Sequence, residues 1–124
     1  MTEIQNKKQY DLEARTLAFA RSVRNFVKKL PKSIVEYEDA KQLVRSSGSV
    51  GANYIEANEA LSKKDFVMRI KICRKEAKES RYWLELIDAD HLPELLEIRN
   101  KLMREAHELM NIFGAILRKS DKGN

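Results

Sequence analysis

Cysteine, proline and glycine are scarce in this sequence, and each scarcity excludes a class of protein. The 124 residues include one Cys, two Pro and four Gly. The lone Cys73 can form neither an intramolecular disulfide nor a cysteine-based zinc site, and it fits a reducing compartment. All-β sandwiches and barrels need many more turn residues than this chain has. We therefore expect a cytoplasmic protein that is not all-β.

Long apolar runs are also missing. No run approaches the roughly 18 residues of a membrane span, and residues 1–10 are too polar for a signal peptide. The chain is 43% apolar and 35% charged, which is too hydrophobic for a disordered protein, and its length suits one core. We predict a flexible N-terminus at residues 1–10, a single domain at 11–119 and a frayed C-terminal tail at 120–124.

Apolar residues recur every three or four positions in four stretches of the chain. This spacing predicts helices over residues of about 11–30, 36–61, 66–89 and 93–119, the third capped by Ser62 or Asp65. The third stretch alternates steps of four and three without an error, which is typical of the seam of a left-handed bundle. Short connections join the four stretches. The sequence therefore predicts an all-α, up-down-up-down antiparallel four-helix bundle.

The second stretch contains a run of small residues, SSGSVGA at 46–52. Helix propensity alone favours a loop there. The apolar period continues on both sides, however, from Leu43 to Leu61, so we predict a helix whose backbone lies close to a neighbour at Ser47, Gly48 and Gly51. A phosphate-binding loop is excluded because the Lys-Ser/Thr ending and the preceding strand are missing.

The net charge is +5, and its excess is concentrated in residues 1–30 and 61–90. One side of the third predicted helix, which we call the basic face, carries Lys64, Lys71, Arg74, Lys75, Lys78 and Arg81. It extends over about 25 Å, so its cations could bind several phosphates of RNA or DNA. The alternative is a solvated lysine surface without a ligand.

A second, mixed surface combines polar and apolar side chains of the second and third helices. We call it the polar face; it comprises Gln42, Arg45, Ser49, Asn53, Glu56, Ile72, Glu76 and Trp83. Apolar residues among the polar ones favour a polar cleft or a subunit interface. The alternative is an exposed surface with intrahelical pairs such as Arg69–Glu76.

No catalytic, metal-binding or cofactor-binding residue is predicted. The only histidines are His91 and His107, whereas a di-iron bundle needs two Glu-x-x-His pairs. Cys73 falls on the apolar seam and is expected to be a small buried residue. No pair of carboxylates stands out for acid–base catalysis. We expect a non-enzymatic protein; an enzyme that uses Arg45 and Glu56 in a cleft is a remote alternative.

Several segments resemble one bacterial family. They are QLVRSSGSVGANYIEA at residues 42–57, SKKDF at 62–66, KEAKE at 75–79 and YWL at 82–84, preceded by Phe26 and LPK at 30–32. Together they are similar to the four-helix bundle proteins encoded in 23S rRNA intervening sequences, over roughly residues 15–90. The resemblance implies a cytoplasmic bundle that assembles into a ring-shaped homopentamer, with nucleic acid as its suspected partner.

Two functions follow as hypotheses. The first is a non-enzymatic oligomeric module that binds the backbone of RNA or DNA through the basic face. The second is a purely structural or protein-interaction oligomer, in which the polar face serves assembly and the basic face serves solubility. Neither predicts a membrane partner.

Overall fold

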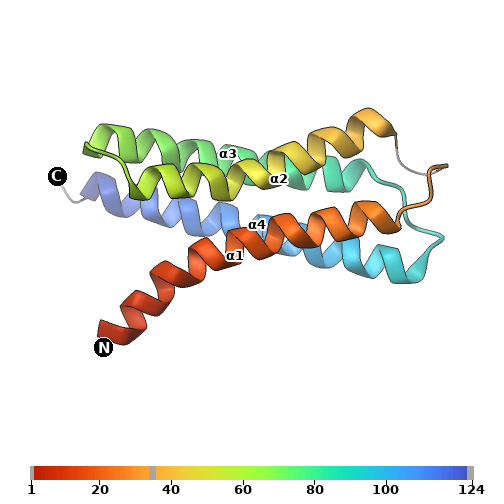
Figure 1. The fold of residues 1–124 in the computed structure, drawn as a ribbon, viewed down its shortest axis with the longest axis horizontal. Helices are drawn as coiled ribbons and strands as arrows, with labels where there is room; N and C mark the ends of the chain where they lie inside the picture. The colour runs from red at the N-terminus through yellow and green to blue at the C-terminus, as the bar shows by residue number, and fades with distance from the viewer. Residues whose placement is uncertain (1, 34–35, 123–124) are drawn as a thin grey trace.

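The protein is a bundle of four antiparallel helices. A computed structural model describes residues 2–33 and 36–122, with side chains described for 12–33 and 36–121. The helices are α1 (Thr2–Lys29), α2 (Tyr37–Asn58), α3 (Lys63–Leu86) and α4 (Pro93–Lys122). They run up, down, up and down, as Figure 1 shows, and the described residues contain no strand. The predicted fold class is confirmed.

Several helix bounds differ from the predicted ones. The helix α1 begins at Thr2 and not near residue 11, because the apolar period marks only the part that packs on other helices. In Figure 1 the N-terminal part of α1 diverges from the rest of the bundle. Ser62 is the N-cap of α3 and accepts a hydrogen bond from the Asp65 amide (3.1 Å). The flexibility of residues 1–10 and 120–124 stays a prediction, and residues 1, 123 and 124 lie outside the described part.

The predicted apolar stripes form a single core. Its buried residues are Leu12, Phe19, Val23 and Phe26 from α1, Leu30 just after it, Leu43, Val50, Tyr54 and Ala57 from α2, Ile70, Cys73, Ala77 and Leu84 from α3, Ile87 just after it, and Leu102, Ala106, Leu109 and Phe113 from α4. Leu61 was predicted to continue the stripe of the second helix. It is 98% exposed, because α2 ends at Asn58.

Arg99 is the charged residue in the apolar stripe of α4. It is half-buried and donates a hydrogen bond to the carbonyl of Ile87 (2.7 Å). That carbonyl lies just beyond the last turn of α3, where backbone oxygens have no partner within the helix. A guanidinium is therefore tolerated at this position because it binds the end of the neighbouring helix.

The small-residue run is helical, as predicted, and α2 is unbroken through it. A Cβ added to Gly51 would lie 2.9 Å from Thr16 Oγ1 and 3.2 Å from Thr16 Cβ, so α1 approaches closely here. Ser46 and Ser47 are fully buried, and Ser80 of α3 donates a hydrogen bond to Ser46 Oγ (2.9 Å). Gly48 differs, because an added Cβ would come no closer than 3.5 Å, to the Arg24 guanidinium. Close approach is thus confirmed at Gly51 and is absent at Gly48.

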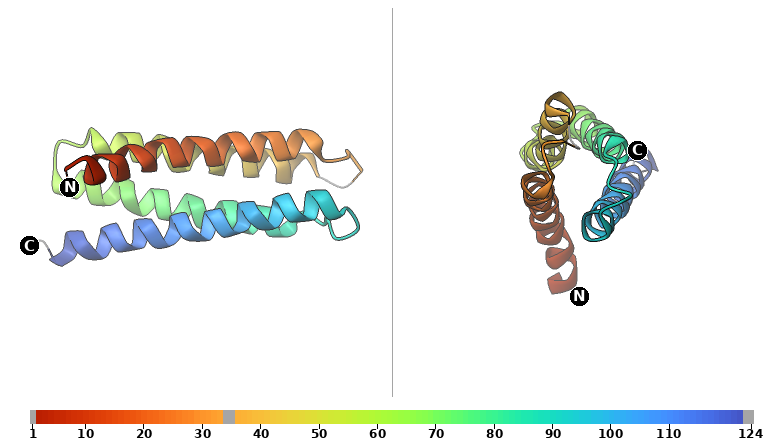
Figure 2. Two further views of the ribbon diagram at one scale, coloured as in Figure 1. Left: turned by 90° about the horizontal axis from the view of Figure 1, so that it is seen from below. Right: turned by 90° about the vertical axis from the view of Figure 1, so that its right-hand side faces the viewer.

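The helices do not pack equally on their neighbours. The most extensive contacts are those of α2 with α3 and of α3 with α4, and α1 packs less on α2 and least on α4. The end view in Figure 2 shows α1 leaning away from α4 towards its N-terminus. Where the two helices do meet, Arg15 forms a bidentate pair with Glu105 (2.7 and 2.8 Å). That hydrogen bond raises the pKa of the Arg15 guanidinium above its usual value.

Candidate functional surfaces

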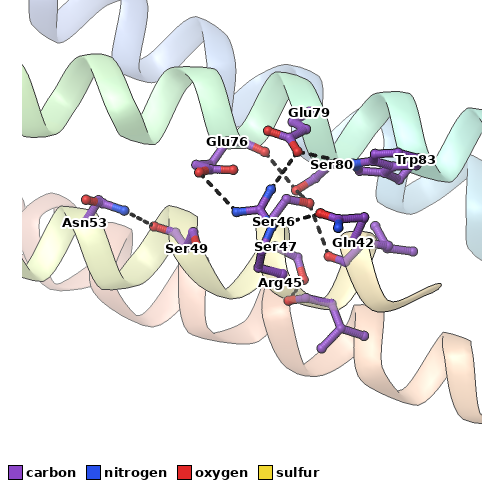
Figure 3. Close-up of polar contacts among 12 residues, drawn as sticks. Gln42, Arg45, Ser46, Ser47, Ser49, Asn53, Glu76, Glu79, Ser80 and Trp83 are labelled. Atoms are coloured by element: carbon purple, nitrogen blue, oxygen red, sulfur yellow. Dashed lines mark hydrogen bonds and ion pairs between the residues drawn. The ribbon is translucent and has the colours of Figure 1, made fainter. Parts of the chain in front are cut away.

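The polar face lies along the line where α2 meets α3, and Arg45 is at its centre (Figure 3). Arg45 donates hydrogen bonds to Glu79 (2.6 Å), Glu76 (3.3 Å) and Gln42 (3.0 Å). Trp83 Nε1 donates to the same Glu79 carboxylate (3.3 Å). The structure therefore brings four of the predicted residues into one network, which Glu79 joins.

The remaining predicted residues of the polar face lie further along the same two helices. Asn53 accepts a hydrogen bond from Arg69 of α3 (3.0 Å) and donates to the Ser49 carbonyl (2.9 Å). Glu56 and Ile72 line a neighbouring depression of about 440 Å³. An intrahelical Arg69–Glu76 pair, the alternative considered from the sequence, does not form. Both side chains bond instead to residues of α2.

Glu76 is the residue of this face whose environment is least complete. It is buried, with 7% of its surface exposed, and only Arg45 bonds to its side chain. The second oxygen, Glu76 Oε1, is buried and has no hydrogen-bond partner among the described residues. Burial lowers the pKa of Arg45, but its bonds to Glu76 and Glu79 outweigh this and the pKa is raised. One guanidinium thus balances two carboxylates, and one buried acceptor is left over.

Exposed apolar side chains also occur on α2, on α3 and in the connection between them. They are Ile55, Leu61, Met68 and Leu86, each with about half or more of its surface exposed. Leu61 and Met68 line the same depression as Ile72, together with Arg69 and the acidic residues Glu56, Glu59 and Asp65. A surface that alternates apolar and charged groups in this way is typical of the core and rim of a protein interface.

The basic face lies on the exposed surface of α3. Lys64, Lys71, Arg74, Lys75 and Lys78 are all exposed. Within the part of the chain that the structure describes, none of these five cations forms an ion pair or a hydrogen bond. The sixth, Arg81, is half-buried and donates to His107 Nδ1 of α4 (3.2 Å). Glu76 and Glu79 of α3 are therefore paired with Arg45 of α2, whereas the five exposed cations of the basic face have no partner among the described residues.

The structure adds residues of α4 that sequence reasoning missed. A groove of about 480 Å³ lies between α3 and α4 and is lined by Arg81, Asn100, Met103, Arg104, His107 and Glu108. We call it the α3–α4 groove. About two helical turns further along the same two helices, Arg74 and Arg118 lie beside Gly114. The signal in the sequence was the seven-residue spacing of Arg104, Asn111 and Arg118, which places them on one side of a helix.

The described side chains offer little that could carry catalysis. Cys73 is fully buried, and its burial raises the pKa of the thiol to about 12, so the reactive thiolate is disfavoured. Among residues 2–33 and 36–122, no three His, Cys, Asp or Glu side chains gather as metal ligands would. His91 is exposed beyond the end of α3. None of the described helices has the length and apolar character needed to cross a membrane.

Comparisons with known proteins agree with the fold. A family model described as 23S rRNA-intervening sequence protein matches residues 8–115, which extends the resemblance through most of α4. The chain is also similar to a solved structure from Bacteroides thetaiotaomicron, described as a protein of unknown function from the S23 ribosomal protein family. The two are 32% identical with a TM-score of 0.75, and the alignment covers 86% of this chain and 97% of the other. No match was found among curated proteins.

Proposed function

Because this chain belongs to the family of 23S rRNA-intervening sequence proteins, we propose that it is a non-catalytic, oligomeric four-helix module that binds nucleic acid. The basic face of α3 makes the contacts, and they are directed at the phosphates of RNA or DNA. A surface of this kind contacts the charged backbone and does not discriminate between base sequences. The reducing cytoplasm is the proposed compartment, which the single buried thiol of Cys73 fits.

One observation carries this proposal: the cations of the basic face have no carboxylate partners. Surface lysines that serve only solubility are usually interspersed with acidic residues. Glu76 and Glu79 of α3 are both bound to Arg45 of α2. From Lys64 to Lys78 the unpaired cations extend over about 21 Å. Such a row can replace several condensed counterions of a nucleic acid at once.

Binding of labelled RNA at two salt concentrations tests the proposal. Single-stranded and double-stranded RNA of about 20 nucleotides are titrated with the protein in about 50 mM and 200 mM salt. We expect measurable binding that weakens steeply with salt. Replacing Lys71, Arg74, Lys75 and Lys78 with Gln makes the affinity less dependent on salt: the magnitude of the negative slope of log affinity against log salt decreases by about 3–4. The decrease is the same for every RNA sequence, because phosphates are what the cations contact.

A matched control separates the basic face from total charge. Replacing Arg21, Lys28, Lys29 and Lys41 with Gln removes the same charge from exposed positions on α1 and α2. This variant is expected to keep most of the affinity and the salt slope. Equal losses in both variants, or no binding by the parent chain at about 50 mM salt, would contradict the proposal.

The polar face is proposed as the surface through which copies of the chain assemble. Glu76 Oε1 is a buried acceptor without a partner, which is costly in a finished structure. A donor from a second copy would complete it, and the exposed apolar residues nearby would be covered. The resemblance noted above makes a homopentamer the specific proposal.

Light scattering at micromolar concentration tests the assembly. A pentamer has a mass of about 72 kDa, five times the 14.4 kDa of the chain. Trp83 packs edge-on against Tyr82, with ring centroids 5.1 Å apart, and borders the polar face. We expect Trp83→Ala to lower the measured mass while the helical circular dichroism signal is retained, since large aromatics anchor interfaces. A parent chain that is a monomer would contradict the assembly.

The alternative function is a purely structural or protein-interaction oligomer. The incomplete environment of Glu76 favours assembly whether or not RNA is bound, so it supports both functions equally. The RNA titration decides between them. A chain that forms a stable oligomer but binds no RNA or DNA would support the structural function alone.

A further inference from the structure

The α3–α4 groove presents several hydrogen-bond donors to one place. Arg81 donates to His107 Nδ1 (3.2 Å), and because a guanidinium has no acceptor, the ring nitrogen Nε2 of His107 carries the remaining hydrogen. Arg99 donates to Asn100 Oδ1 (3.3 Å), which leaves the Asn100 amide hydrogens available. Arg104 is exposed and, among the described residues, has no partner. Donors on both helices thus line a groove large enough for part of a nucleotide.

The only carboxylate in the lining is Glu108, and it is partly engaged elsewhere. Glu108 Oε1 accepts a hydrogen bond from Arg15 of α1 (3.3 Å). Among the residues whose side chains the structure describes, neither the Arg81 nor the Arg104 guanidinium forms an ion pair. An oxyanion with several acceptor oxygens is the ligand that such a donor set suits best.

A second cationic position lies further along the same two helices, at Gly114. A Cβ added to Gly114 would lie 3.4 Å from Arg118 Nη1 and 3.8 Å from Arg74 Nε, so the two guanidiniums meet over a residue that has no side chain. Neither arginine bonds to a carboxylate of the described residues. Neighbouring like charges repel, and an anion placed between the two guanidiniums would offset the repulsion.

The two positions are in register. Arg81 and Arg74 are seven residues apart on α3, and His107 and Gly114 are seven apart on α4. Because α3 and α4 are antiparallel, both steps run in the same direction along the groove, over about 10 Å. At a rise of about 3.4 Å per nucleotide this distance corresponds to about three nucleotides of a stacked strand.

We propose that one single strand of RNA or DNA lies along the α3–α4 groove, with a phosphate at Arg81 and Arg104 and another at Arg74 and Arg118. The inference rests on the proposed function and adds α4 to the binding surface. A single strand fits better than a duplex because Arg81, Asn100 and Met103 are half-buried in the recess, which rigid duplex phosphates would not reach. The Met103 side chain offers a base an apolar surface.

Two exposed arginines of α4 allow a direct test. A fluorescently labelled 12-nucleotide single-stranded RNA is titrated with the parent chain and with the R104Q/R118Q variant. We expect about tenfold weaker binding. We also expect the magnitude of the slope of log affinity against log salt to decrease by about 1.4, at about 0.7 per phosphate contact of a single strand. The control K101Q/K119Q removes two exposed cations from another side of the same helix and is expected to stay within about twofold of the parent.

A second variant tests the shape of the groove without changing its charge. Gly114→Leu places a side chain between Arg74 and Arg118 and is expected to weaken binding of the 12-nucleotide RNA about fivefold or more. Leu is a better helix former than Gly, so α4 should remain intact. Unchanged affinity in this variant and in R104Q/R118Q would overturn the inference.

The outcomes separate this inference from the proposed function. If the Gln variant of Lys71, Arg74, Lys75 and Lys78 loses binding but R104Q/R118Q does not, the basic face stands and the groove is wrong. No binding by the parent chain overturns both. Tighter binding of a 12-base-pair duplex than of the single strand overturns the single-strand assignment. Competition by poly-L-glutamate at the same charge concentration as RNA would assign the groove to acidic protein segments instead.

Discussion

Both sides of α3 carry charged residues, but the two sides differ in how these residues are bonded. On the side facing α2, Glu76 and Glu79 are bound to Arg45, and Ser80 is bound to Ser46 in the interior. On the side facing α4, Arg81 borders the α3–α4 groove and donates a hydrogen bond to His107. One helix thus has a side where polar groups join it to its neighbour and a side where most cations have no partner among the described residues.

The difference teaches that pairing, and not charge density, distinguishes a structural surface from a candidate binding surface. Removing a charged side chain that is bound to its neighbour lowers the free energy of unfolding. An unpaired exposed charge contributes almost nothing to stability, so its replacement is expected to leave the free energy of unfolding nearly unchanged. Stability measurements on the two sides should therefore differ even where the substitutions are similar.

The tightness of the packing around α2 is tested by Gly51→Leu, which has the largest expected effect. Even a Cβ at this position would lie 2.9 Å from Thr16 Oγ1, so a leucine must separate α1 from α2. We expect the free energy of unfolding, measured with urea, to fall by about 3 kcal/mol. The control is Gly48→Leu, where an added Cβ meets only the end of Arg24. A stabilised Gly51→Leu variant would show that helix propensity dominates at this site.

The paired side of α3 is tested by Arg45→Met. This substitution leaves the buried Glu76 carboxylate without its only side-chain partner, at an expected cost of about 2 kcal/mol in urea unfolding. The cost stays below that of a fully buried pair because Arg45 is itself partly exposed. Lys78→Met on the basic face is the control and should change stability by less than about 0.5 kcal/mol. Equal effects would remove the distinction between the two sides.

A double-mutant cycle sharpens the comparison further. Ser46→Ala and Ser80→Ala each remove one partner of a buried hydrogen bond of 2.9 Å, and their coupling energy is expected to be about 1 kcal/mol. The corresponding cycle across the other side, Arg81→Gln with His107→Gln, should give a coupling near zero because that bond is exposed to solvent. A larger coupling for the second cycle would contradict the proposed contrast.

Gly114→Ala has the smallest expected effect, and its sign is informative. The added methyl group would meet only the movable ends of Arg118 and Arg74. The gain in helix propensity should therefore raise the free energy of unfolding by about 0.5 kcal/mol or slightly more. Destabilisation would show that the α3–α4 groove is packed as tightly as the contact of α2 with α1.

Most of the fold could be predicted from the sequence because each helix buries its own apolar stripe. The unbroken steps from Ile70 to Leu84 place α3 in the core without knowledge of its neighbours. The path of α2 through its small residues also followed from the continuing period. The early start of α1 was missed because residues 2–10 carry no apolar period, and the end of α2 at Asn58 was missed because the exposed Leu61 continues the period.

The candidate surfaces were predictable only where a single helix defines them. The basic face lies on α3 alone, so the seven-residue spacing was sufficient. The contact of Arg81 with His107 depends on how far α3 and α4 are rotated and shifted against one another, which neither helix encodes by itself. The choice of Arg45 as the partner of Glu76, in place of Arg69, has the same cause.

The uneven packing of α1 has a consequence for the order of folding. α2, α3 and α4 follow one another along the chain, so their mutual contacts close short loops and form at little entropic cost. The pair of Arg15 with Glu105 joins residues 90 positions apart and closes the ring of helices. We expect α1, which precedes the other three helices in the chain, to be the last to dock, and its amide hydrogens to exchange with solvent before those of α3.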